Sequence, residues 1–87
     1  MATYDREQIR AALALTDPAV SSFLDLQTGQ VVRIVEGDAS PENQRLSDAI
    51  MASIGDRYRY ISGGNQAAGA TDVAAWLENE GLGNAEG

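Results

Sequence analysis

The chain has 87 residues and a formal net charge of −7, with 13 acidic residues, six arginines, no lysine and no histidine. It has no cysteine either, which excludes disulfides, thiolate catalysis and zinc sites built on cysteine. This length predicts one domain, no apolar run reaches the ~20 residues of a membrane helix, and the polar N-terminus predicts a cytoplasmic protein.

The first predicted element is a helix that begins after Asp5. Asp5 and Gln8 have the spacing of a capping box, in which the Asp5 carboxylate accepts a backbone hydrogen bond and the Gln8 side chain reaches back to the cap. Tyr4 and Ile9 stand where a hydrophobic staple would join them. Pro18 disfavours helical backbone in the residue before it, so the helix ends there at the latest.

A β-hairpin is predicted next, with strands over residues 22–26 and 30–35 and a turn at residues 27–29. Gly29 can supply the positive φ that a tight turn needs. Because side chains alternate along a strand, Leu24 and Phe23 must lie on opposite faces. We expect helices to cover one face, formed by Leu24, Leu26, Val32, Ile34, Tyr58 and Tyr60.

A second helix begins after Ser40, a strong N-cap residue, with Pro41 at its first position. Its apolar residues recur at helical spacing, which predicts a buried stripe. Gly55 is placed to end the helix. The stripe consists of Leu46, Ala49, Ile50 and Ile54, with Met51 at its edge.

A third strand is predicted over residues 56–61, where charged and aromatic residues alternate. The second helix carries the chain back across the sheet, so this strand runs parallel to the second. If the first strand lies between them, every neighbouring pair is antiparallel and the order is 2-1-3. We favour the order 2-1-3; the alternative order is 1-2-3.

A glycine-rich loop is predicted over residues 62–70, followed by a third helix capped by Thr71 and ended by Gly81. The whole is an α+β domain of residues 1–81, in the order α-β-β-α-β-α, with a disordered tail at residues 82–87. The apolar stripe of the third helix consists of Val73, Trp76 and Leu77.

The hairpin and third strand resemble the N-terminal half of an uncharacterised bacterial protein family. The shared features are an LDLxTGxVV hairpin, here starting at Leu24, an RY strand, here Arg57 and Tyr58, and an amphipathic helix around Trp76. The resemblance implies a bacterial origin and a similar fold. It implies no activity and no site residue, because the family has none established.

The residue inventory predicts a protein that is not an enzyme and has no cofactor, metal or small-molecule substrate. Without His, Cys or Lys, only carboxylates, hydroxyls and arginine could serve catalysis. Asp25, Glu36, Asp38 and Asp56 lie at strand ends and turns, where solvated acids are usual. Residues 36–38 lack the ligand series of a calcium loop, and the glycines before the third helix lack a Walker lysine.

A protein-interaction module is the leading interpretation. If helices cover only one sheet face, the other exposes an apolar patch, which either another helix or a protein partner must cover. A C2 homodimer is the simplest symmetric solution. Arg57 and Arg59 either pair with acids across the sheet or contribute to a surface. The candidate interaction surface consists of Phe23, Val31, Arg33, Val35, Arg57, Arg59 and Ile61.

The alternative is a regulatory module that contacts nucleic acid through an Arg and Tyr sheet face. The charge of −7 disfavours it, because affinity for phosphate backbones comes from basic clusters.

Overall fold

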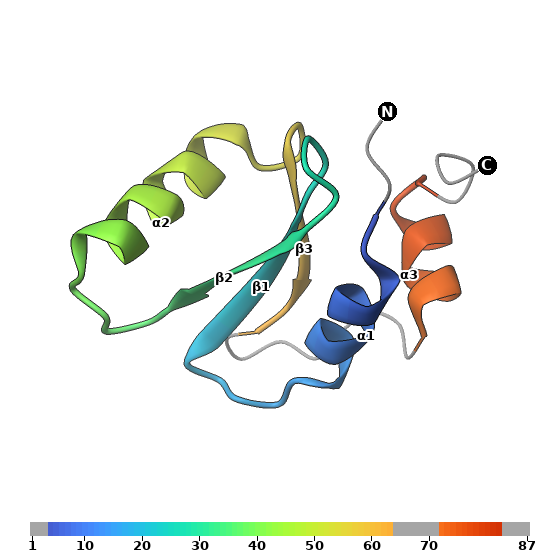
Figure 1. Cartoon of the computed structure of the whole chain (residues 1–87), viewed down its shortest axis with the longest axis horizontal. Helices are drawn as coiled ribbons and strands as arrows, with labels where there is room; N and C mark the ends of the chain where they lie inside the picture. The colour runs from blue at the N-terminus through green and yellow to red at the C-terminus, as the bar shows by residue number, and fades with distance from the viewer. Residues whose placement is uncertain (1–3, 64–71, 83–87) are drawn as a thin grey trace.

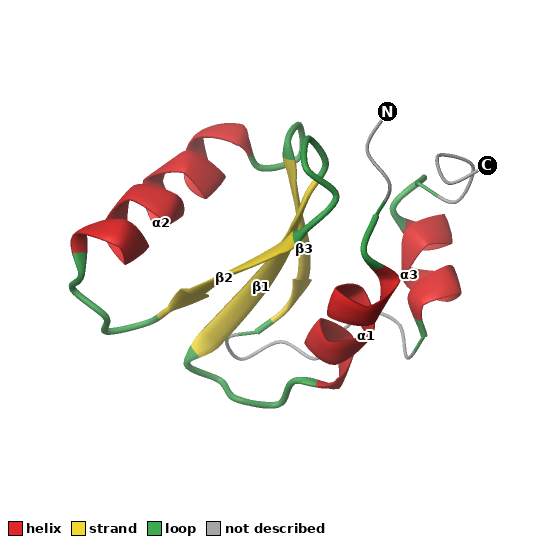
Figure 2. Cartoon of the chain, in the orientation of Figure 1, coloured by secondary structure: helices red, strands yellow, loops and turns green. Residues whose placement is uncertain are grey.

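The computed structural model describes residues 4–63 and 72–82. The elements are α1 (Arg6–Ala14), β1 (Val20–Asp25), β2 (Val31–Val35), α2 (Pro41–Ser53), β3 (Tyr58–Ser62) and α3 (Val73–Asn79). The strands form an antiparallel sheet in the order β2-β1-β3, which confirms the predicted α+β class, element order and strand order. Helix α2 lies on one side of the sheet, and α1 and α3 lie together on the other (Figures 1 and 2).

Helix α1 is anchored to the hairpin turn through its N-cap. The Asp5 carboxylate accepts from the Gln8 N–H at 3.1 Å, as the capping box predicts. The Asp5 N–H donates to the carbonyl of Gly29 at 2.7 Å. The Gln8 side chain does not reach back as expected; its Oε1 accepts from the Val31 N–H at 2.8 Å. The turn carbonyl has taken the place of the second half of the capping box.

The hairpin has a longer turn than predicted, and this changes its register. Asp25 pairs with Gln30, with the Asp25 N–H donating to the Gln30 carbonyl at 2.9 Å. The loop is therefore 26–29, and Gly29 closes it with φ of 77° and an N–H bond to the Asp25 carbonyl at 2.8 Å. A predicted turn at 27–29 would pair Leu26 with Gln30. The difference of one residue reverses which face each strand-2 side chain shares with strand 1.

The predicted division of the sheet faces is wrong for this reason. Phe23 lies opposite Val32 and Tyr60, whereas Leu24 lies opposite Val31 and Arg59. Phe23 therefore belongs with the residues beneath α2, and Leu24 with those beneath α1 and α3. The apolar cluster under α2 contains Phe23, Ile50 and Tyr58, with Val32, Ile34, Leu46 and Tyr60 half-buried around them.

The larger apolar cluster lies between the sheet and the α1–α3 pair. The most deeply buried residues include Ile9, Leu24 and Ile61, each at most 1% exposed to solvent. Because each sheet face has a cluster, the chain covers with its own helices the two largest residues of the expected exposed patch, Phe23 and Ile61. The cluster consists of Tyr4, Ile9, Ala12, Leu24, Ile61, Val73, Trp76, Leu77 and Leu82.

Helix α2 has the predicted start but a narrower buried stripe. The Ser40 hydroxyl accepts from the Asn43 N–H at 3.3 Å, which confirms the N-cap. Ile50 is fully buried, yet Ala49 is exposed, and Met51 and Ile54 are 58% and 49% exposed. The helix ends at Ser53, and extended backbone at Ile54 turns that side chain out of the predicted stripe.

The last two elements are shifted slightly from their predicted bounds. Asp72 is the N-cap of α3, its carboxylate accepting from the Ala75 N–H at 2.8 Å, where Thr71 was expected. Thr71 and most of the predicted glycine-rich loop lie outside the described residues. Residues 83–87 of the predicted tail lie outside them as well. Leu82 belongs to the core, because it is only 8% exposed.

Candidate interaction surface

The residues of the predicted interaction surface divide into three groups in the structure. Phe23 and Ile61 are buried on opposite faces, at 4% and 1% exposure. Val31, Arg33 and Val35 share one face of β2, since they alternate along it. The other two, Arg57 and Arg59, are engaged elsewhere. The structure therefore brings three of the seven residues together.

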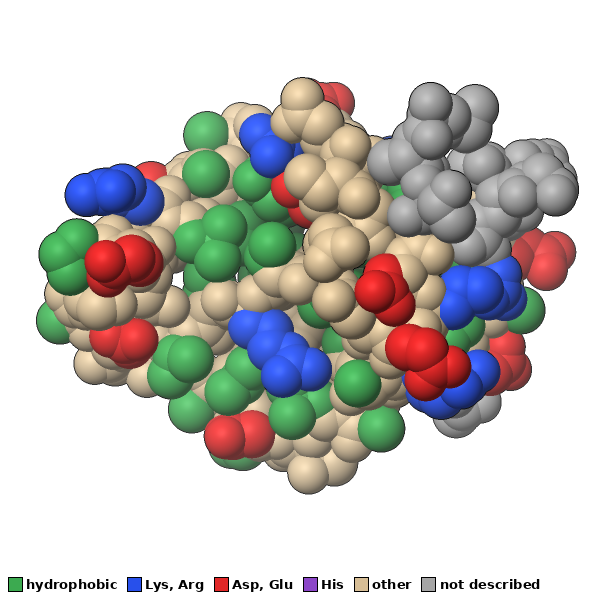
Figure 3. Space-filling model, in the orientation of Figure 1, with side chains coloured by type: hydrophobic (Ala, Val, Ile, Leu, Met, Phe, Trp, Pro, Cys, Tyr) green, Lys and Arg blue, Asp and Glu red, His purple; other side chains and the backbone are tan. Residues whose placement is uncertain are grey.

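We call this group the β2 strip: Val31, Arg33 and Val35, with Val20 beside Val35 on the neighbouring strand. Arg33 is exposed, Val35 is 40% exposed, and Val31 and Val20 are half-buried. On the face that Figure 3 shows, hydrophobic, basic and acidic side chains are interspersed. The β2 strip is thus a cation bordered by aliphatic surface.

Arg57 forms a bidentate ion pair with Asp25. Its Nε donates to Oδ1 at 3.0 Å and its Nη2 donates to Oδ2 at 2.9 Å. Asp25 is 4% exposed, and the Gln27 N–H also donates to its Oδ1. The hydrogen bonds from Arg57 lower the pKa of the Asp25 carboxyl below its usual value, despite the opposing effect of burial. The guanidinium also lies 5.1 Å from the centre of the Tyr58 ring.

Arg59 connects β3 to the end of α3. Its Nη1 donates to the Glu80 carbonyl at 3.0 Å and lies 3.6 Å from the Glu80 carboxylate. A cation at this position complements the negative end of the helix dipole. Of the two alternatives for these arginines, pairing across the sheet holds for Arg57, whereas Arg59 pairs with an acid at the end of α3 and not with one across the sheet.

Arg33 differs from these arginines in its contacts. Within residues 4–63 and 72–82 its side chain has no ion pair or hydrogen bond. Arg45, on the exposed side of α2, is the other arginine without such a contact there. Arg33 is distinguished from Arg45 by its place on an edge strand, between aliphatic side chains.

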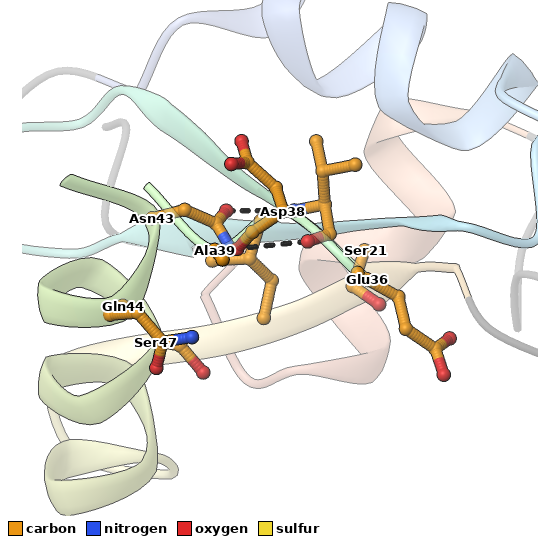
Figure 4. Close-up of a pocket in the computed structure, with 10 residues that line it drawn as sticks. Ser21, Glu36, Asp38, Ala39, Asn43, Gln44 and Ser47 are labelled. Carbon is orange, nitrogen blue, oxygen red and sulfur yellow. Dashed lines mark hydrogen bonds between the residues drawn. The ribbon is translucent and has the colours of Figure 1, made fainter. Parts of the chain in front are cut away.

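A hollow of about 560 Å³ lies between the end of β2, the following loop and the first turns of α2. Ser21, Gln44 and Ser47 border it together with the acids Glu36 and Asp38, and Asn43 bonds to the Val35 backbone at its side (Figure 4). The polar groups of the lining are hydroxyls, amides and carboxylates, and Ile34, Val35 and Ala39 add aliphatic surface. In the part of the chain that is described, no three acidic residues converge as a metal site would require.

Sequence reasoning missed two side chains that contact the edge of β2. Gln8 accepts from the Val31 N–H, and Asn43 bonds to both backbone groups of Val35: Oδ1 accepts from the N–H at 2.9 Å and Nδ2 donates to the carbonyl at 3.0 Å. Local pattern cannot indicate the Gln8 contact, because its partner is 23 residues away.

Comparison of the chain with protein-family models, curated proteins and solved structures found no match. The bacterial family resemblance stays a prediction from short motifs. In the described segments, no helix is both long and apolar enough to cross a bilayer.

Proposed function

We propose that this chain is a small, non-catalytic protein-interaction module whose docking surface is the β2 strip. The observation that carries the proposal is the environment of Arg33: an exposed guanidinium without a side-chain contact in the described residues, bordered by Val31 and Val35. Arginine is one of the residue types enriched at binding hot spots. A partner would therefore present a carboxylate surrounded by aliphatic side chains.

The chemical inventory supports a binding role rather than catalysis. No histidine, cysteine or lysine is available as base or nucleophile. Among the described residues, the one acid with a clearly lowered pKa is Asp25, which Arg57 holds in a structural ion pair. Its carboxylate stabilises the hairpin and does not face the hollow.

The nucleic-acid alternative loses support from the same contacts. Of the three arginines it needs, Arg57 and Arg59 are paired with Asp25 and Glu80. Arg33 alone is a weak phosphate site on a chain of charge −7. Retention on a DNA or RNA column at low salt, lost in Arg33→Glu, would restore the alternative.

Self-association is one form that the interaction can take, and it can be measured directly. Sedimentation across a concentration series should give either a monomer or a dimer that dissociates in Arg33→Glu. Because the two largest apolar residues of the predicted patch are internally covered, the β2 strip is the surface on which any dimer should depend.

The test of the proposal is site-specific photo-crosslinking. A crosslinking residue at Val35 should capture a defined protein, and the same residue at Glu42 on exposed α2 should not. Arg33→Glu should abolish the adduct, whereas Arg45→Glu, with the same change of charge, should leave it intact. Equal capture from both positions, or capture unaffected by Arg33→Glu, would contradict the proposal.

A further inference from the structure

β2 is an edge strand, and its backbone alternates between bonds to β1 and groups that point away. Two ladder bonds fix this alternation: the Asp25 N–H donates to Gln30, and the Glu36 N–H donates to Ala19. Even-numbered residues of β2 thus face β1. The backbone groups of Val31, Arg33 and Val35 point outward, where an additional strand would bind.

The two ends of this outward edge are occupied by side-chain amides. Gln8 of α1 covers the Val31 N–H, and Asn43 of α2 covers both backbone groups of Val35. The Asn43 amide pairs with Val35 as the peptide group of a neighbouring strand would. Protection of this kind limits uncontrolled strand pairing at a sheet edge.

Between the two amides the edge is open. The Arg33 N–H and carbonyl and the Val31 carbonyl have no hydrogen-bond partner among residues 4–63 and 72–82. From Val31 to Val35 the strand extends about 14 Å, at ~3.4 Å per residue. Only the two Arg33 groups and the Val31 carbonyl are open within this length, so the edge accommodates a short extended segment whose central residue pairs with Arg33.

We propose that the β2 edge binds an extended segment of a partner protein by strand addition, with an acidic residue opposite Arg33. The inference rests on the proposed function and specifies its partner. Residues paired across an antiparallel ladder have their side chains on the same face, where opposite charges stabilise the pair. Aliphatic residues two positions before and two positions after the acid lie on the same face as the acid, and they would then extend over the β2 strip.

The same charge argument selects against a second copy of this chain at the edge. A two-fold antiparallel pairing centred on the opening places Arg33 opposite Arg33 of the other copy. Like charges directly opposite each other destabilise a strand pair. The occupant is thus a different, acidic segment, and any homodimer would have to form through the side chains of the strip.

A peptide titration tests the inference. The isotope-labelled full chain is titrated with the capped pentapeptide Val-Thr-Glu-Thr-Val and with its counterpart carrying Lys in place of Glu. The acidic peptide should bind about tenfold more tightly than the basic one, from the difference between an attractive and a repulsive pair. Binding should also slow hydrogen exchange of the Arg33 amide.

The control is a pair of charge reversals of equal size. Arg33→Glu should reverse the preference between the peptides, whereas Arg45→Glu on α2 should not. Absence of binding, or equal binding of both peptides, would overturn the inference. Binding that perturbs the Val31 and Val35 methyl signals but leaves Arg33 amide exchange unchanged would overturn strand addition while retaining the β2 strip as the docking surface.

Discussion

Asp25→Asn should destabilise the fold by about 2 kcal/mol at neutral pH. The substitution removes the carboxylate that accepts both Arg57 hydrogen bonds and keeps one oxygen for the Gln27 N–H. Breaking a fully buried pair costs ~3–5 kcal/mol, and an exposed pair contributes roughly 0–1 kcal/mol. Here the Asp25 side chain is 5% exposed and that of Arg57 is 44% exposed, so the expected loss lies between these limits.

The dependence on pH gives this prediction a second test. The folded-state pKa of Asp25 lies below the ordinary value of 3.8. The ion pair therefore contributes its full stability above that value, and the contribution is lost as pH falls through the folded pKa. The difference in unfolding free energy between the natural chain and Asp25→Asn should be largest near neutrality and shrink in acid.

Urea unfolding followed by the fluorescence of Trp76, which is 3% exposed and the only tryptophan, measures both effects. Asp48→Asn, on the exposed side of α2, is the control and should change stability by less than ~0.5 kcal/mol. A loss in Asp25→Asn no larger than in the control, or one that persists undiminished in strong acid, would refute the reasoning.

Three further predictions concern packing and the hairpin, and each is measured by the same urea titration. Gly63→Ala should lower the free energy of unfolding by more than ~2 kcal/mol, because the added Cβ would overlap the Val20 carbonyl and the Ser21 backbone. Gly37→Ala, also at positive φ but in open space, should lower it by about 1 kcal/mol. Equal losses in the two variants would contradict this. Ile50→Ala should cost about 3 kcal/mol, as the fully buried residue of α2, and Met51→Ala almost nothing; a large loss in the latter would mean that α2 packs on a different side. Gln8→Ala should cost about 1 kcal/mol by removing the acceptor of the Val31 N–H, with Gln44→Ala as the exposed control; indistinguishable variants would show that water replaces the Gln8 amide at no cost.

The helices and strands were predicted well where their sequence patterns span only a few residues. The caps at Asp5 and Ser40 lie three residues from the amides that they bond, so their chemistry is visible in the sequence. Of the two strand orders that the sequence left open, the structure has 2-1-3, in which every neighbouring pair is antiparallel. The Asp25–Arg57 pair was one of two stated alternatives, and the structure selects it.

Features that depend on exact register could not be predicted in this way. The turn has one residue more than the QTG motif indicates. Because of that residue, Phe23 shares a sheet face with Val32 and Leu24 shares one with Val31, which is the reverse of the predicted assignment. The interaction surface was assembled from the wrong face assignment, so only Val31, Arg33 and Val35 remain together. The amides of Gln8 and Asn43 were missed because they meet β2 only after the helices have packed.

The two apolar clusters lie on opposite faces of the sheet and have few contacts in common. The half of the protein under α2 and the half under α1 and α3 should therefore differ in the free energy of local unfolding. Helix α2 contributes a single fully buried side chain, Ile50, whereas α1 and α3 enclose the larger cluster from two directions. Lifting α2 would expose Phe23 and Tyr58 yet leave Leu24 and Ile61 enclosed. The fold should therefore loosen in two stages, with α2 detaching from an intact remainder before the chain unfolds globally.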